Sequence, residues 1–257
     1  MFRIVILLSL SALFFSPAAA QQADLTIDQI VEKHTEALGG ADKLKAIQTV
    51  ILTGKASLMG GQVEAPVVMR VKRPDMIRMD LTVQGQSFIQ AFDGSTAWVL
   101  NPFSGSSDAQ KQNEEDTKVA RDDADFIDGG LVDYKAKGNK LELLGKEDVG
   151  GVHAYKIKVT KRSGSVDYEF VDAKTFLELQ TTGKRKQEGQ EIDFVDTPSD
   201  FKAVNGVMIP YRLVQTANGN PAMDLTIEKV EANVPIEDTY FHIPDKPKTD
   251  RAKEPPH

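Results

Sequence analysis

Apolar and polar residues alternate with a period of two along most of the chain after residue 49. Turn residues separate these runs, for example Gly60-Gly61 and Asn218-Gly219. Alternation bounded by such turns is typical of antiparallel strands with one buried face. The pattern predicts about twelve strands, among them runs whose apolar positions are Val63, Ala65, Val67, Met69 and Val71; Ile77, Met79, Leu81 and Val83; Tyr155, Ile157 and Val159; and Val207, Ile209, Tyr211 and Leu213.

Helical spacing is found at three places. Thr26 stands three residues before Gln29, which is a capping-box spacing, and Gly39-Gly40 ends the apolar stripe that follows. That stripe consists of Ile27, Ile30, Val31, His34 and Leu38. A short second helix is predicted over 41–47, and a third over 117–127 within the acidic segment 105–130.

The apolar strand faces exceed what two or three helices can cover. Either the sheet closes into a packed barrel, or it curves and leaves an apolar cavity. Apolar surface exposed to water costs about 25 cal/mol per Å², so such a surface packs or binds something. The pattern alone leaves both alternatives open.

The first twenty residues have the features of a secretory signal peptide. Arg3 precedes an apolar run that is too short to span a bilayer, and Ala18-Ala19-Ala20 provides a cleavage site. We expect cleavage after Ala20, a single domain over 21–244 and a charged, proline-rich, flexible tail over 245–257. The 257 residues include no cysteine, which excludes disulfides, thiolate chemistry and an acylated cysteine anchor. We therefore expect a periplasmic protein.

Composition and motifs give no support for catalysis. The formal net charge is -7, so we expect no nucleic-acid partner. The four histidines form no triad or metalloprotease pattern. The acidic cluster 123–128 has Ile127 where a calcium loop needs a carboxylate, and we interpret it as a solvated face. We predict no catalytic residue, no metal and no cofactor.

Several motifs resemble the LolA family, periplasmic carriers of outer-membrane lipoproteins. The sequence Val71-Lys72-Arg73-Pro74-Asp75 is followed by Asp93-Gly94-Ser95-Thr96-Ala97-Trp98 and then by Asn101-Pro102-Phe103. The segment 234–244, which contains Phe241-His242-Ile243-Pro244, is similar to the closing segment of that superfamily.

The resemblance implies a mainly β (α+β) fold: an unclosed antiparallel barrel of about eleven strands with a helical lid over an apolar cavity. It implies that Arg73 ties the lid shut by charge-assisted hydrogen bonds. Ile77 stands where the family tends to carry an aromatic residue at the cavity mouth. The expected cavity and lid residues are Arg73, Ile77, Met79, Leu81, Trp98, Phe103, Ile30 and His34. For Trp98 and His34, simple packing is the alternative.

The expected ligand is an acylated lipoprotein or another lipid. The expected partners are an inner-membrane donor and an outer-membrane acceptor, and we expect a monomer. Two other functions stay open. The same fold can serve as a sensor that reports lipid or lipoprotein to a membrane partner, for which the acidic segment 105–130 is the candidate interaction surface. A hydrolase would need His34 or His153 beside a carboxylate and a nucleophile, and no motif supports it.

Overall fold

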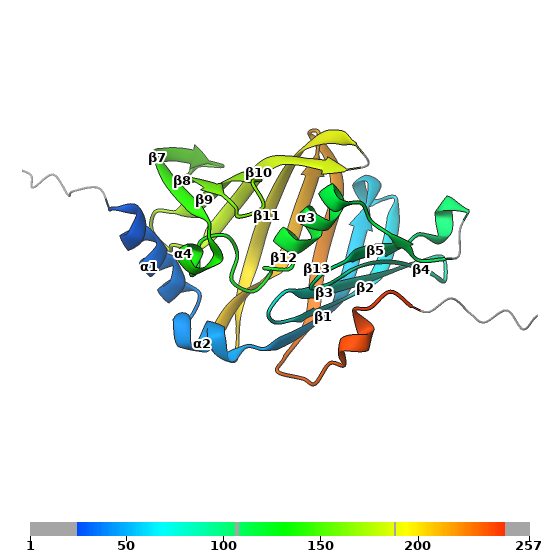
Figure 1. The fold of residues 1–257 in the computed structure, drawn as a ribbon. Coiled ribbons are helices and arrows are strands. Elements are labelled where there is room, and N and C mark those ends of the chain that lie inside the picture. The colour runs from blue at the N-terminus through cyan, green and yellow to red at the C-terminus, as the bar shows by residue number, and fades with distance from the viewer. Residues whose placement is uncertain (1–24, 106–107, 188, 245–257) are drawn as a thin grey trace, which may run out of the picture.

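The computed structural model describes residues 25–105, 108–187 and 189–244 (Figure 1). The predicted signal peptide at 1–20 and the predicted tail at 245–257 lie outside the described residues. In the part of the chain that is described, no helix is long and apolar enough to cross a membrane.

The helices of the described ranges are short. They are α1 (Ile27–Ala37), α2 (Ala41–Ala46), α3 (Glu114–Asp123) and α4 (Tyr134–Lys137), with 3-10 turns η1 (Met59–Gly61), η2 (Pro102–Ser104) and η3 (Asp238–Tyr240). α1 begins with the predicted capping box, because Thr26 and Gln29 each accept the other's backbone N–H. α3 differs from the prediction. Asn113 caps it before the predicted start, and it ends before residues 124–127.

The strands form one antiparallel sheet. Within the described residues they are β1 (Thr49–Leu58), β2 (Val63–Lys72), β3 (Met76–Val83), β4 (Gln86–Asp93), β5 (Ala97–Leu100), β6 (Gln110–Lys111), β7 (Lys140–Val149), β8 (Val152–Thr160), β9 (Val166–Asp172), β10 (Glu178–Gln187), β11 (Gln190–Val204), β12 (Val207–Ala217) and β13 (Asn220–Ala232). Their order is β6-β5-β4-β3-β2-β1-β13-β12-β11-β10-β9-β8-β7.

The sheet is not closed, because β6 and β7 are its two edges. The predicted mainly β fold, an unclosed antiparallel sheet with a few covering helices, is confirmed. The described residues form 13 strands rather than the eleven or twelve expected. One of them, β6, is a two-residue strand with both residues exposed, and so has no alternating pattern to reveal it.

One face of the sheet, here called the inner face, is covered by the helices (Figure 1). Its larger apolar cluster lies on β1–β3, β12 and β13, and includes Leu52, Val67, Met69, Val71, Leu81, Ile209, Leu225 and Ile227. A second cluster joins α1 to β8 and β9. At the corner after α1, a Cβ at Gly39 would lie 2.1 Å from the carbonyl oxygen of Gly206, so only glycine allows this approach.

The opposite face, here called the outer face, carries the C-terminal segment 233–244. Lys72 Nζ donates to the carbonyl oxygen of Ile236 at 2.7 Å, and Arg78 Nη1 donates to that of Tyr240 at 2.7 Å. Phe241 is fully buried there. The segment therefore crosses β1–β5 on the side away from the helices.

Candidate functional site

The candidate site is the inner apolar face beneath a lid segment, defined here as residues 114–137 (α3, the following loop and α4). Ile77, Met79 and Leu81 lie on alternate positions of β3, opposite Val71, Met69 and Val67 of β2. All three pack in or against the larger apolar cluster. The structure thus brings together three of the predicted cavity residues on one surface.

Two side chains of the lid segment fill this surface. Phe126 and Ile127 pack against the larger apolar cluster. A cavity of about 30 Å³ lies between them and Val50, Met208 and Ile209. In this structure the lid's own side chains therefore take the place that a ligand would need.

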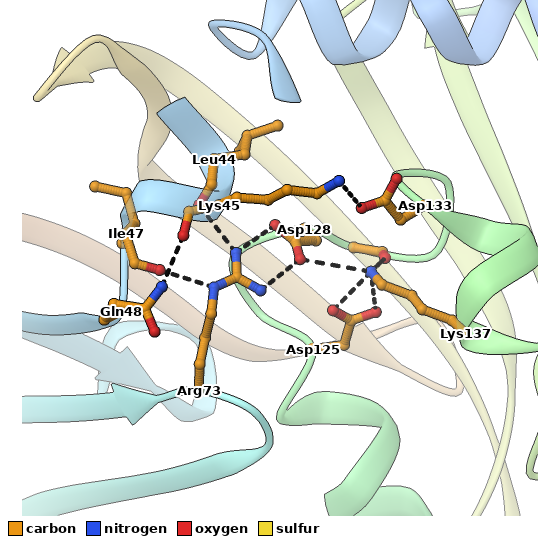
Figure 2. Close-up of polar contacts among 10 residues, drawn as sticks. Leu44, Lys45, Ile47, Gln48, Arg73, Asp125, Asp128, Asp133 and Lys137 are labelled. Carbon is orange, nitrogen blue, oxygen red and sulfur yellow. Dashed lines mark hydrogen bonds and ion pairs between the residues drawn. The ribbon is translucent and has the colours of Figure 1, made fainter. Parts of the chain in front are cut away.

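Arg73, in the turn between β2 and β3, fastens the lid segment (Figure 2). Its Nη1 donates to Asp128 Oδ2 at 2.6 Å and its Nη2 donates to Asp128 Oδ1 at 2.7 Å. Its Nε donates to the carbonyl oxygen of Ile47 at 2.7 Å, and Nη2 also donates to that of Leu44 at 3.1 Å. One guanidinium thus joins the sheet, the end of α2 and the lid. A bidentate geometry of this kind is among the stronger polar contacts in proteins.

The other acids of the lid loop are paired as well. Lys137 Nζ donates to both carboxylate oxygens of Asp125, at 2.8 and 2.6 Å, and to the carbonyl oxygen of Gly129 at 2.7 Å. Lys45 lies 3.0 Å from Asp133 (Figure 2). The interpretation of the acidic cluster 123–128 as a solvated face is therefore wrong for Asp125 and Asp128, because cations from elsewhere in the chain neutralise them.

Burial and pairing shift the pKa values of this group. Hydrogen bonds to Asp128 raise the pKa of Arg73 above its usual value. Burial alone would raise the pKa of Asp128, but hydrogen bonds from Arg73 and the charge of Lys137 outweigh it and hold that pKa low. Burial raises the pKa of Asp125 to about 6 despite the contact with Lys137. At neutral pH, Arg73 and Asp128 are a stable ion pair.

A buried carboxyl lies directly under the lid loop. A Cβ at Gly130 would lie 2.2 Å from Oε1 of Glu169, so any larger residue at this position would displace the Glu169 carboxyl. Glu169 is 6% exposed. Burial, together with the neighbouring Glu178, raises the pKa of Glu169 to about 8.

The remaining predicted site residues lie elsewhere. Ile30 and His34 belong to α1 and are buried against β8 and β9, where His34 Nδ1 donates to the carbonyl oxygen of Phe176 at 2.8 Å. Trp98 is buried on the outer face, and its Nε1 donates to the carbonyl oxygen of Phe241 at 2.7 Å. Phe103 is 53% exposed in η2. None of these four side chains belongs to the larger apolar cluster.

Sequence reasoning missed Asp128, Phe126 and Ile127, which complete the site. Asp128 lies 55 positions from Arg73, and no local spacing links the two. The available signal was the pair of apolar residues, Phe126 and Ile127, inside a strongly acidic segment.

Comparison with known proteins shows the fold. No protein-family model matches the sequence, and a search of characterised proteins found no match. Among solved structures, a LolA superfamily protein from Nitrosomonas europaea is similar with a TM-score of 0.55 and 15% identity, covering 85% of this chain and 98% of that one.

Two further solved structures are similar to the same extent. A domain described as an outer membrane lipoprotein-sorting protein from Vibrio parahaemolyticus has a TM-score of 0.57 and 11% identity, over 84% of this chain and 97% of that one. A DUF1329 family protein from Desulfovibrio piger has a TM-score of 0.55 and 14% identity, over 84% and 97%. This chain therefore has a LolA-like fold.

Proposed function

We propose that this protein is a carrier that holds the acyl chain of a lipoprotein or another lipid on its inner apolar face. The observation that carries the proposal is a wide apolar surface covered by Phe126 and Ile127, on a lid that Arg73 and Asp128 fasten by charge. A permanent core can be held by apolar packing alone, because a buried ion pair adds little net stability to it. An ion pair suits a lid that opens, since water solvates both charged groups once they separate.

The energies allow an acyl chain to open the lid. Breaking a partly buried ion pair costs on the order of 3 kcal/mol, whereas each buried methylene group contributes about 0.8 kcal/mol. About four methylenes offset the loss of the Arg73–Asp128 pair, and the rest of a long acyl chain can replace the contacts of Phe126 and Ile127. A ligand that binds only the open form therefore opens the lid when the free energy gained by burying its methylenes exceeds the free energy lost with the lid contacts.

The location and partners are part of the same proposal. The signal-peptide pattern at 1–20 supports export to the periplasm. A diffusing carrier there needs a donor at the inner membrane and an acceptor at the outer membrane. No catalytic role is proposed, since the site offers hydrophobic surface and an ion pair rather than a nucleophile and base.

The test is ligand binding. Native mass spectrometry of protein purified from a periplasmic extract should show co-purified acyl lipid. Delipidated protein should increase the fluorescence of a fatty-acyl probe, saturating at one probe per chain. If the protein carries no lipid and no acyl probe binds, the proposed function is excluded.

A further inference from the structure

A second cavity, here called the polar cavity because most of its lining residues are charged or polar, lies between α3 of the lid segment and the sheet. Its volume is about 330 Å³. The sheet side is formed by the hairpin between β8 and β9 and by β10, and the lid side by α3. No side chain of α3 is buried, and on the side of this cavity α3 contacts the sheet through hydrogen bonds and ion pairs.

The carboxylates of α3 occupy hydrogen-bond donors of the sheet. Asp122 Oδ2 accepts a hydrogen bond from Ser163 Oγ at 2.7 Å and another, shorter one from Ser165 Oγ. Both hydroxyls come from the hairpin that joins β8 to β9. Two hydroxyls thus donate to one carboxylate oxygen. An anionic oxygen of a ligand could accept the same two hydrogen bonds in place of Asp122.

Cations of β10 are paired with the lid in the same way. Arg185 Nη1 lies 3.2 Å from Asp123 Oδ1, and Lys186 Nζ lies 3.0 Å from Glu115 Oε1. When α3 lifts, it removes the carboxylates of Asp122, Asp123 and Glu115 together, and it leaves hydroxyls, a guanidinium and an ammonium on the sheet.

Cations outnumber carboxylates among the sheet residues that line this cavity. The sheet side carries Lys161, Lys184, Arg185 and Lys186 against the single lining carboxylate of Asp167. Asp167 pairs with Lys161 at 2.7 Å, and Asp196 lies 3.6 Å from Arg185. Glu191 and Asp193 lie 2.5 and 3.8 Å from Lys184. Burial lowers the pKa values of Lys161 and Arg185, but nearby carboxylates outweigh it and raise both above their usual values. Both side chains therefore stay charged at neutral pH.

The lid residues that face the polar cavity and those that face the apolar site are only a few positions apart in the sequence. Asp122 and Asp123 lie at the end of α3, and Phe126 and Ile127 follow directly after it. The lid segment thus presents carboxylates to the cations and, next to them, apolar side chains to the larger apolar cluster. This is the pattern of an anionic amphiphile, with a charged head beside an apolar chain.

We infer that the polar cavity binds the anionic, phosphate-bearing head of the acyl ligand, and that the carboxylates of Asp122 and Asp123 occupy its place while the lid is closed. The inference rests on the proposed function, because the same lid movement uncovers both surfaces. A phosphate group suits the uncovered donors, since it offers several acceptor oxygens and charge to hydroxyls, a guanidinium and ammonium groups.

The test compares two ligands with the same acyl chain, lysophosphatidic acid and the neutral monoacylglycerol, below their micelle-forming concentrations. The wild-type protein should bind lysophosphatidic acid on the order of tenfold more tightly. The double variant Ser163→Ala/Ser165→Ala should lose most of this preference, while it binds the monoacylglycerol at least as tightly as the wild-type protein does, because the two hydroxyls also hold Asp122 of the closed lid. Ser199→Ala, an exposed change on β11, is the matched control and should leave both affinities unchanged.

A change on the lid should act on both lipids. Asp122→Asn removes a charge that helps to hold the lid closed but keeps a side chain that can hydrogen bond, so it should tighten the binding of both lipids by a similar factor and preserve the preference for lysophosphatidic acid. Inorganic phosphate should compete with lysophosphatidic acid and not with the monoacylglycerol. If the cavity were a site for free phosphate alone, the protein would bind phosphate but would bind the two lipids equally well.

The outcomes separate the two proposals. Equal affinity for the two lipids in the wild-type protein, or a preference that survives in the double serine variant, overturns the inference and leaves the carrier function standing. If neither lipid binds, the carrier function itself fails. Thermal melting of each variant, compared with that of Ser199→Ala, shows whether it is folded.

Discussion

Replacing Arg73 with methionine should make the protein bind acyl chains more tightly. Arg73→Met keeps much of the apolar stem of the side chain but removes the guanidinium that joins Asp128, Ile47 and Leu44. The closed lid then contains a carboxylate that is only 10% exposed and has lost its bidentate partner. Lys137 Nζ, 3.9 Å from Asp128, still compensates part of its charge but does not replace the two hydrogen bonds from Arg73.

The size of the effect follows from the burial of the pair. Removing one partner of a fully buried ion pair costs 3–5 kcal/mol, and Arg73 is 22% exposed, so we expect about 2 to 3 kcal/mol. The ratio of closed to open lid should then fall by roughly 30- to 150-fold. The apparent affinity for an acyl ligand rises by up to the same factor, until the open form predominates.

Fluorescence titration with a fatty-acyl probe measures this change, and far-ultraviolet circular dichroism confirms that the variant is folded. Arg212→Met is the matched control. Arg212 forms a similar two-bond pair with Asp224, at 3.0 and 2.7 Å, but it is 53% exposed, and exposed pairs contribute little. A folded Arg73→Met protein with the wild-type affinity, or a weaker one, would refute the proposed role of this ion pair.

Three further changes have distinct expected effects. Phe126→Ala should strengthen acyl-probe binding while lowering the unfolding free energy by about 1 to 2 kcal/mol, as measured by titration and denaturant melts; unchanged binding would show that Phe126 does not block the site. Glu169→Gln should stabilise the protein more at pH 8.5 than at pH 5. Burial raises the folded-state pKa of Glu169 to about 8, so the wild-type carboxyl is neutral at pH 5 and its contribution to stability is lost as pH rises from about 4.5 to 8; an equal gain at both pH values in thermal melts would contradict this. Trp98→Phe should cost about 1 kcal/mol of stability through the lost hydrogen bond to Phe241 and leave acyl binding unchanged, so a binding defect would contradict the outer-face position of Trp98.

Local patterns were sufficient for most of the fold. The capping box of Thr26 and Gln29 and the alternation along β3 are set by neighbours a few residues away, so the sequence predicted α1 and the inner-facing Ile77, Met79 and Leu81. These elements are predictable because period and capping are properties of a single segment.

The lid was predicted less well, because its structure depends on distant partners. The acids of 123–128 look solvated in isolation, and only the fold brings Arg73 to Asp128 and Arg185 to Asp123. Trp98 shows the same limit. Its motif position suggested the cavity, but its hydrogen-bond partner, Phe241, lies 143 positions away on the outer face.

Photo-crosslinking tests the central claim, that an acyl chain binds on the inner apolar face in place of the lid's side chains. A fatty acid with a diazirine near the end of its chain would be bound, illuminated and located by peptide mass spectrometry. We predict labelling on inner-face positions such as Met69, Met79, Leu81 and Ile209, abolished by excess unlabelled fatty acid. Labelling confined to the exposed Phe103 region, or labelling that unlabelled fatty acid does not reduce, would contradict the claim.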